Sequence, residues 1–397
     1  MLAASTTLSA GGYKLTTSSL NGTALSSANV ANAHGADAAY YNPANMVFNG
    51  GNNDFEADLT YIGLPPIEYT PDAAAAISSE SESAFIPTFH YVSAPMGRVR
   101  AGLAVVTPAG LTKRWEEQPA RFYANEYSLM AVEFNPTLAV AVSAQVSVAF
   151  GARFVYSEAK AKGDGAGLPG ADPRSGISRS MEGDSVDAGY NLALSYRPLD
   201  SLSLAATYRS KVNLTLEGEA SVDIGAYHAD TKGSVESLLP AAFSLAAAYR
   251  FDTDTTLEFV YERTFWSENK SLDFEYDDAV VESVLGAPID KNWNDTSTYR
   301  LGLTRAYANW SVMAGTFYDE TPIPDATLNF EAPDADSYGV SLGGRYRFGS
   351  AWEIGLSGMY VVKKDRSVSS PPNENGIDGE FSNAKAYLVT AGVGYRF

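Results

Sequence analysis

Apolar and polar residues alternate along the last stretch of the chain, from Tyr387 to Phe397. One face carries Tyr387, Val389, Ala391, Val393, Tyr395 and Phe397, and the other carries Leu388, Thr390, Gly392, Gly394 and Arg396. A strand of a transmembrane β-barrel alternates in this way because its outer face meets lipid and its inner face meets a wet lumen. The edge strand of a soluble sandwich can also alternate, but it rarely ends a chain on an aromatic residue. The pattern therefore favours the closing strand of a barrel.

The same alternation recurs in several earlier segments. They cover residues 145–156, 202–209, 243–251, 257–262, 337–348 and 352–363. Their polar faces carry too many charged side chains to form a protein core, whereas their apolar faces end in aromatic residues. A lipid-facing band flanked by aromatic girdles has this composition. These segments are therefore predicted to be membrane-spanning strands.

Short and long connections alternate between the predicted strands. Short turns lie near 95–97, 142–144, 198–200, 252–254, 306–308 and 349–350, and long polar connections cover roughly 64–83, 111–125, 161–182, 218–238, 271–293, 319–335 and 365–383. In bacterial barrels the short turns face the periplasm and the long loops face the exterior. The pattern predicts an all-β fold, a transmembrane antiparallel β-barrel of about 14 strands.

The segment before the first predicted strand does not alternate. Residues 11–48 are rich in Gly, Ala, Ser and Asn, and a barrel of this size encloses a lumen that leaks unless it is filled. We expect residues 11–50 to form a plug, or hatch, inside the lumen and residues 51–397 to form the barrel. The alternative is a disordered periplasmic extension. Residues 1–10 look like the tail of a signal peptide or an expression remnant.

Composition narrows the function classes. The net charge of −19 leaves no basic stripe for nucleic acid, and the absence of Cys removes disulfides, thiol nucleophiles and thiolate metal sites. Mean hydropathy is −0.14, too polar for a helical membrane protein. The histidines, His34, His90 and His228, are far apart in sequence and in unlike contexts. We therefore expect no catalysis, no cofactor and no metal site, and we expect the barrel to lie in a bacterial outer membrane.

Several short motifs occur in the order and spacing of a known family. They are Asn42-Pro43-Ala44 after the Gly/Ala-rich segment, Phe89-His90-Tyr91-Val92, Tyr208-Arg209-Ser210-Lys211-Val212, Tyr299-Arg300, and the run from Phe317 to Pro324. With about 14 strands, the chain resembles the FadL family of outer-membrane transporters for long-chain fatty acids and other hydrophobic compounds. The resemblance covers nearly the whole chain from Gly11.

The resemblance implies a route for the substrate. Extracellular loops capture it, a pocket in the barrel binds it, and a shift of the hatch at Asn42, Pro43 and Ala44 releases it sideways through a kinked third strand. A local break is expected at Thr107, Pro108, Ala109 and Gly110, because Pro cannot donate a ladder hydrogen bond and Gly tolerates unusual dihedrals. The alternative is that the strand ends before Thr107 and Pro108 opens the loop.

The resemblance also implies ligand contacts. Lys291 stands eight residues before Tyr299, the spacing of a lysine that helps to hold the head group in the family, although a solvated loop lysine is the alternative. Gly163 stands where the family has its second basic residue, and Lys160 and Lys162 lie nearby. This departure leaves room for a neutral substrate.

Three large aromatic residues, Trp115, Phe122 and Tyr123, occupy one predicted loop. Exposed aromatic clusters mark binding sites unless the rings pack on one another. These residues are expected either to line an entry groove or to pack against neighbouring loops.

The predicted partners are a hydrophobic small molecule, outer-membrane lipid and lipopolysaccharide, and the barrel-assembly machinery through the C-terminal strand ending at Phe397. The leading function is passive uptake of hydrophobic compounds, most of all long-chain fatty acids. Alternatives are an uptake channel for neutral or aromatic hydrocarbons, a general polar porin, an outer-membrane hydrolase and a structural or adhesive barrel.

Overall fold

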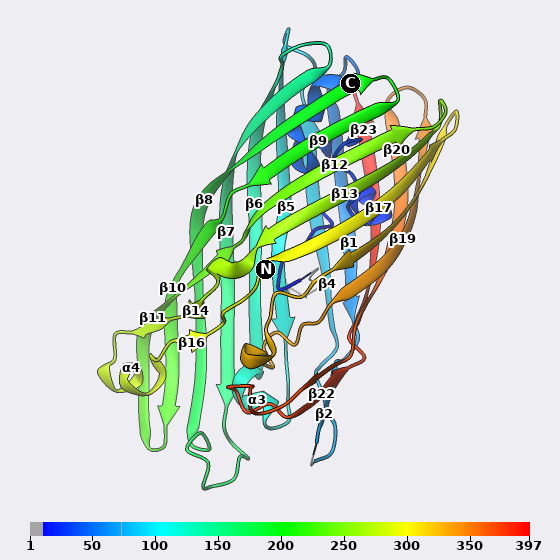
Figure 1. The fold of residues 1–397 in the computed structure, drawn as a ribbon. Coiled ribbons are helices and arrows are strands. Elements are labelled where there is room, and N and C mark those ends of the chain that lie inside the picture. The colour runs from blue at the N-terminus through cyan, green and yellow to red at the C-terminus, as the bar shows by residue number, and fades with distance from the viewer. Residues whose placement is uncertain (1–10, 73) are drawn as a thin grey trace.

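The computed structural model describes residues 11–72 and 74–397. Its main element is an antiparallel sheet that closes on itself, because the first strand pairs with the last strand as well as with its sequence neighbour. Figure 1 shows the result, a tilted barrel with short turns at the end near the C-terminus and long loops at the other end. A membrane-spanning sheet must close in this way to satisfy its backbone hydrogen bonds.

In the described part of the chain, 14 spans form the barrel wall, as predicted. In order, the spans are β1 (Asp54–Leu64), β4 (Glu82–Val92), β5 (Val99–Lys113), β6 (Glu126–Ala141), β7 (Val146–Asp164), β8 (Ile177–Leu199), β9 with β10 (Leu202–Arg209 and Val212–Ile224), β11 with β12 (Tyr227–Leu239 and Ala241–Arg250), β13 (Thr255–Phe265), β17 (Thr296–Ala306), β18 (Trp310–Asp319), β19 (Ser337–Phe348), β20 (Trp352–Lys363) and β23 (Lys385–Arg396). Two spans are written as pairs because Ser210-Lys211 and Pro240 interrupt them.

The remaining elements are short. The N-terminal segment contains α1 (Leu20–Ala24), α2 (Ala38–Tyr41) and the 3-10 helix η1 (Pro43–Phe48). The long loops contain β2 (Glu68–Pro71), β3 (Ile77–Ser78), α3 (Ala120–Ala124), η2 (Trp266–Glu268), β14 (Ser271–Leu272), β15 (Phe274–Tyr276), α4 (Ala279–Leu285), β16 (Ile289–Asp290), η3 (Asp325–Thr327), β21 (Arg366–Val368) and β22 (Gly379–Ser382). No helix in the described ranges is long and apolar enough to cross a membrane.

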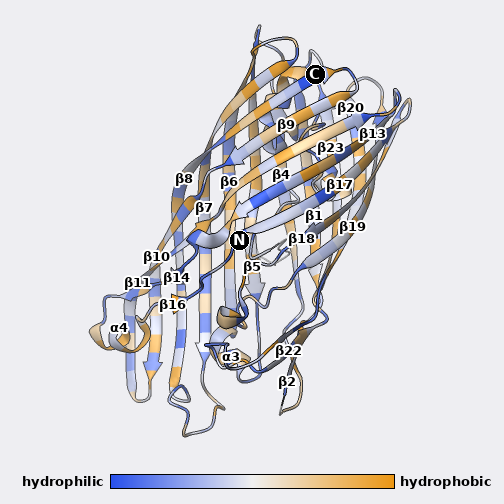
Figure 2. Ribbon diagram, in the orientation of Figure 1, coloured by the Kyte–Doolittle hydropathy of each residue, from blue (hydrophilic) through white to orange (hydrophobic). Residues whose placement is uncertain are grey.

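Side chains alternate across the wall as the sequence predicts. In β23, Tyr387 and Val389 are 43% and 44% exposed, whereas Thr390, on the opposite face of the same strand, is fully buried. Figure 2 shows hydrophobic and hydrophilic residues alternating along the strands. The exposed apolar set forms the outer surface, and the buried polar set faces the lumen.

All six predicted short turns are confirmed, but one of the predicted long loops is wrong. Residues 218–238 mostly continue the strands, because β10 and β11 pair from Val212–Leu239 out to Ile224–Tyr227. The predicted loop at 161–182 is present but shorter, since β7 runs to Asp164 and β8 starts at Ile177. Beyond the lipid the outer face meets water, so it becomes polar and the alternation that marks a strand fades. The predicted loop at 111–125 also starts late, since β5 runs to Lys113.

The N-terminal segment lies inside the barrel against small residues of the wall. A Cβ atom on Gly315 of β18 would come within 2.2 Å of the Leu25 carbonyl carbon, and one on Gly343 of β19 within 2.5 Å of the Ala24 Cβ. Hydroxyl pairs add polar contacts on the same side, with Thr23 bonded to Thr390 at 2.8 Å. Glycine therefore lets α1 approach the wall closely.

Three charged side chains form a buried network on the opposite wall. Glu133 of β6 is fully buried and accepts a hydrogen bond from the Arg153 Nε of β7 at 2.9 Å. Its second carboxylate oxygen forms an ion pair with Arg209 of β9. The network joins β6, β7 and β9 across the intervening strand β8.

Removing the acid of this network should destabilise the barrel. In Glu133→Ala, Arg153 and Arg209 lose their shared carboxylate, and breaking a buried pair in this way costs about 3–5 kcal/mol. Reversible urea unfolding in lipid vesicles measures the free energy of unfolding. Glu217→Ala, at an exposed outward position of β10, is the control and should stay within about 0.5 kcal/mol of the wild type. Equal effects of the two substitutions would contradict a stabilising role of the network.

Candidate functional site

A largely apolar cavity opens inside the loop end of the barrel. It is lined by β6, β7, β8, β10, β11 and the β14–β15 segment. Leu129, Leu216, Val235 and Phe274 contribute apolar walls, and Lys160, Glu182 and Glu219 contribute charge near the rim. We call it the ligand cavity, because ligand sites for small hydrophobic molecules have mainly apolar walls.

The barrel wall is interrupted between β4 and β5. All 11 residues of β4 pair with β1, but only Phe89–Val92 pair with β5, opposite Gly102–Val105. Contact between the two segments resumes beyond the strands, where the Glu80 amide donates to the Arg114 carbonyl at 2.9 Å. We call the unpaired stretch between residues 82–88 and 106–113 the wall seam.

A bulge in β5 coincides with the wall seam. Val106 pairs with Glu133 and Ala109 with Ala131, so Thr107 and Pro108 together oppose one residue of β6. The strand continues through Pro108 to Lys113, and the alternative in which it ends before Thr107 is wrong. The bulge bends β5 away from β4, because an extra residue on one strand locally disrupts the ladder.

The start of the chain pairs with β5 at this bulge. The Leu15 amide donates to the Pro108 carbonyl at 2.8 Å, and the Gly110 amide donates to the Tyr13 carbonyl at 3.1 Å. The Tyr13 ring packs edge-on against Trp266 with centroids 4.8 Å apart, and burial raises the pKa of Tyr13 to about 12. The N-terminal segment thus supplies, from the lumen, hydrogen bonds that β4 does not make.

The predicted gate residues are buried where the N-terminal segment meets the wall. Asn42 caps η1, since its side-chain oxygen accepts from the Ala44 amide at 3.1 Å, and its amide donates to the Ser195 hydroxyl of β8 at 2.9 Å. Pro43 is the first residue of η1. Ser147 of β7 donates to the Ala44 carbonyl at 2.6 Å. These contacts tie the three residues to two neighbouring spans.

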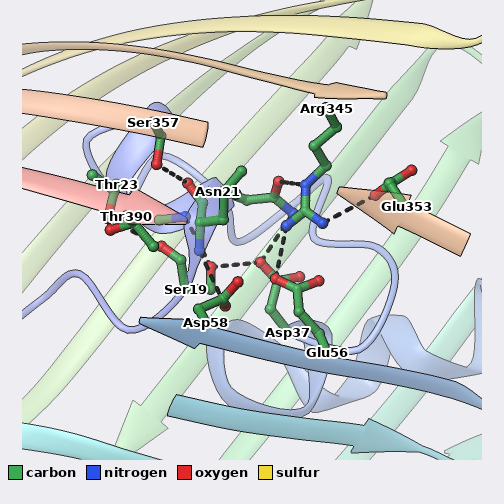
Figure 3. Close-up of polar contacts among 12 residues, drawn as sticks. Ser19, Asn21, Thr23, Asp37, Glu56, Asp58, Arg345, Glu353, Ser357 and Thr390 are labelled. Carbon is green, nitrogen blue, oxygen red and sulfur yellow. Dashed lines mark hydrogen bonds and ion pairs between the residues drawn. The ribbon is translucent and has the colours of Figure 1, made fainter. Parts of the chain in front are cut away.

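Asp37 holds the N-terminal segment together. One carboxylate oxygen accepts hydrogen bonds from Ser19, Asn21 and Asn29 at 2.8, 3.1 and 3.0 Å. The side chain is fully buried, and burial, followed by the charge of Glu56, raises the pKa of Asp37 to about 6. A single carboxylate therefore joins three parts of the N-terminal segment (Figure 3).

Arg345 of β19 links this cluster to the barrel. Its guanidinium donates to the Asn21 side-chain oxygen at 2.7 Å, to Glu56 of β1 at 2.7 Å and to Glu353 of β20 at 3.0 Å. Figure 3 shows these groups converging where the N-terminal segment meets the wall. A polar vestibule of about 1270 Å³ reaches Arg345 from the short-turn end.

The predicted lysines already have carboxylate partners. Lys291 is 4% exposed and forms an ion pair with Glu331. Lys160 lies on the rim of the ligand cavity, 3.2 Å from Glu182, and Lys162 lies 2.6 Å from Glu126.

The predicted loop aromatics pack among the loops. Trp115 is fully buried, and its Nε1 donates to the Phe330 carbonyl at 3.0 Å. Phe122 and Tyr123 belong to α3 and lie under the Arg174 guanidinium, 5.3 and 5.7 Å from the ring centroids. Tyr123 also lines a loop pocket of about 660 Å³.

Sequence reasoning missed several buried charged residues of this region, among them Asp37, Glu258, Arg345 and Lys113. Glu258 accepts hydrogen bonds from the amides of Val30 and Ala31 at 2.6 Å each and anchors the N-terminal segment to β13. For Glu258, Arg345 and Lys113 the available signal was a charged residue on the inward face of a strand, but many inward positions carry charge. Only contact with a segment distant in sequence distinguishes these residues.

A closed barrel with an apolar cavity, an internal segment and a wall seam defines an outer-membrane transport protein. The chain belongs to the family of outer membrane protein transport proteins (OMPP1/FadL/TodX), whose family model matches residues 1–397. It is 23% identical over 385 residues to the long-chain fatty acid transport protein of Escherichia coli O6:H1, covering 86% of this chain and 84% of the relative. The predicted family and the outer-membrane location are confirmed, and members are transport proteins rather than enzymes.

Two solved structures share the fold. A Pseudomonas aeruginosa FadL homologue superposes with a TM-score of 0.86 at 19% identity, covering 97% of this chain and 99% of that chain. The Ralstonia pickettii toluene transporter TbuX superposes with a TM-score of 0.70 at 17% identity, covering 95% and 97%.

The raised pKa of Asp37 predicts that the N-terminal segment is held more firmly in acid. Its ordinary pKa is 3.8 and its folded-state pKa is about 6, so the ionised group destabilises the folded N-terminal segment above about pH 6. This effect disappears as pH falls through 6 towards 3.8. Glu56, Arg345 and His34 are the charged or titratable groups acting on it. Single-channel conductance in planar bilayers should therefore be lower at about pH 5 than at about pH 7.5.

Asp37→Asn keeps the acceptor oxygen but cannot ionise, so it should reduce this difference in conductance. Asp273→Asn, in an exposed loop, should retain the wild-type difference. An unchanged pH response in Asp37→Asn would show that another group titrates.

Proposed function

We propose that this protein carries hydrophobic compounds, most of all long-chain fatty acids, passively across the outer membrane. Loops capture the substrate, the ligand cavity binds it, and it leaves sideways through the wall seam when the N-terminal segment shifts. The observation that carries the proposal is the coincidence of the wall seam, the β5 bulge and the N-terminal pairing at Pro108.

Capture is assigned to the loop end. The loop pocket of about 660 Å³ is lined by Tyr69, Tyr123, Phe330 and Arg174. Aromatic walls bind apolar chains. An arginine stacked on aromatic rings adds a positive charge beside them, which suits an amphipathic molecule. Tyr123 would contact the substrate in this pocket. Trp115 packs edge-on against Phe330, another residue of the pocket wall.

Lateral release fits the polarity of the two exits. A substrate leaving through the short-turn end would cross the vestibule lined by Arg250, Asp254, Arg345 and Glu353. Transfer of an apolar molecule into these polar surroundings gives no favourable free energy, whereas the wall seam opens towards lipid. Transfer of apolar surface from water into a hydrocarbon phase is favourable by about 25 cal/mol per Å².

The sequence relatives support fatty acid as substrate, since several of them are long-chain fatty acid transport proteins. The ligand cavity supports a second candidate, a neutral or aromatic hydrocarbon. Its charged rim contains Glu182 and Glu219 but only Lys160 as a cation, and Lys160 is paired with Glu182. One of the structural neighbours is a toluene transporter.

Deleting Pro108 tests lateral release. The deletion leaves Thr107 alone opposite the single residue of β6, so one-to-one pairing with β6 is restored while Ala109, Leu111 and Lys113 keep their inward orientation. A straight β5 should pair further with β4 and close the wall seam. Uptake of labelled oleate and of labelled toluene is measured in cells that lack their own transporter, and we expect at least a tenfold loss for each transported compound.

Deletion of Gly170, in the open loop between β7 and β8, is the matched control and should leave uptake unchanged. Heat-modifiable migration on gels verifies that both variants form barrels. Full uptake by a folded Pro108 deletion would refute lateral release through the wall seam. Entry of small sugars in place of oleate and toluene would identify a polar porin.

A further inference from the structure

Lys113 is a buried lysine without a carboxylate partner. It is the last residue of β5, pairs in register with Tyr127 of β6 and is 3% exposed. Within the described ranges its ammonium has one hydrogen bond, to the Ser79 hydroxyl at 3.4 Å, and no ion pair. The nearby Glu82 is occupied by Arg114, which donates to both of its oxygens at 2.9 and 2.8 Å.

An unpaired buried ammonium is costly. Taking a charge out of water costs several kcal/mol unless an opposite charge or good hydrogen bonds replace the solvent. The other lysines near the lumen meet this requirement, since Lys291 is paired with Glu331 and Lys363 with Asp334. Lys113 therefore lacks a partner that a bound anion would supply.

Lys113 lines a small, mainly apolar pocket beside the wall seam. Leu64, Leu111 and Val361 form apolar walls, and the Gly12 backbone closes one side. The charged residues of the lining are Lys113, Lys363, Lys385 and Asp334. The chain as a whole carries a net charge of −19. The lining of this pocket has the opposite sign, because it contains three lysines and one aspartate. We call it the seam pocket.

Cross-strand neighbours line the seam pocket and the ligand cavity. Leu111 and Lys113 line the seam pocket, and their register partners on β6, Leu129 and Tyr127, line the ligand cavity. Neighbouring strands lie about 4.8 Å apart, so one amphipathic molecule can reach both. The cationic side would take the head group and the apolar side the chain.

We propose that the seam pocket is the head-group site for an amphipathic acid, with the Lys113 ammonium bonded to its carboxylate and its hydrocarbon chain in the ligand cavity. This assignment rests on the proposed uptake function and selects long-chain carboxylic acids as its substrate class. It places the cationic contact at Lys113 instead of Lys291, Lys160 or Lys162, which have protein partners.

The site also explains where the substrate waits before release. Leu111 and Lys113 lie on the part of β5 that is unpaired with β4, next to the wall seam. Asp334 of the same pocket accepts hydrogen bonds from the Gly12 amide at 3.0 Å and from Thr321 at 2.6 Å. The bound carboxylate thus lies beside the start of the N-terminal segment that pairs with Pro108.

Lys113→Met tests the assignment because it keeps the length of the side chain and removes its charge. Uptake at limiting concentration is measured in cells lacking their own transporter, with labelled oleate and labelled oleyl alcohol, which have the same chain and different head groups. We expect oleate uptake to fall roughly tenfold to a hundredfold, as loss of a charged hydrogen bond implies. Oleyl alcohol uptake should stay within about twofold, since a neutral head group does not need the ammonium.

Lys113→Arg retains the charge and should restore most of the oleate uptake. Lys232→Met, an exposed lysine of β11, is the matched control and should change neither substrate. Heat-modifiable migration and the amount of protein in the outer membrane verify folding. Lys113→Gln, also neutral, replaces Lys113→Met if the latter does not assemble.

The outcomes separate this inference from the proposed function. If the wild type carries neither oleate nor oleyl alcohol, the proposed function itself is wrong. If the wild type carries both and the folded Lys113→Met variant keeps full oleate uptake, or loses both substrates equally, the seam pocket is not a head-group site. In that case hydrophobic uptake still stands.

Discussion

The structure depends on the requirement that backbone hydrogen bonds be satisfied inside lipid. A sheet that crosses a membrane must close, since each unsatisfied amide or carbonyl there costs several kcal/mol. The pairing of β1 with β23 provides this closure. The wall seam between β4 and β5 is the departure from it, and the N-terminal pairing at Pro108 partly compensates from the lumen side. A break in the wall and a segment inside the barrel are therefore parts of one arrangement.

Charge inside the barrel follows from the same constraint. The outer faces must be apolar, so polar side chains gather inside, where each buried charge needs a partner. Glu133 with Arg153 and Arg209, and Arg345 with Glu56 and Glu353, meet this need within the protein. Against that background the unpaired Lys113 is an exception, and its position beside the wall seam connects the electrostatics of the lumen to ligand binding.

Periodicity predicted most of the fold because lipid imposes it residue by residue. The short turns and the strands within the membrane were predicted correctly, since each strand there has one face towards lipid and one towards the polar lumen. The extensions of β7, β8, β10 and β11 were taken for loops, because above the membrane the outer face is polar and the contrast between faces weakens. Pro108 was flagged as a break, but only the register with β6 shows a bulge in a continuing strand.

The sequence by itself determined the barrel class and the approximate number of strands, because each depends on local pattern and composition. Only the tertiary structure decided which lysine lacks a partner. Lys291 and Lys113 look alike in sequence, but Glu331 lies beside the first and Arg114 occupies the acid nearest the second. Such pairings join residues distant in the chain, and local pattern carries no information about them.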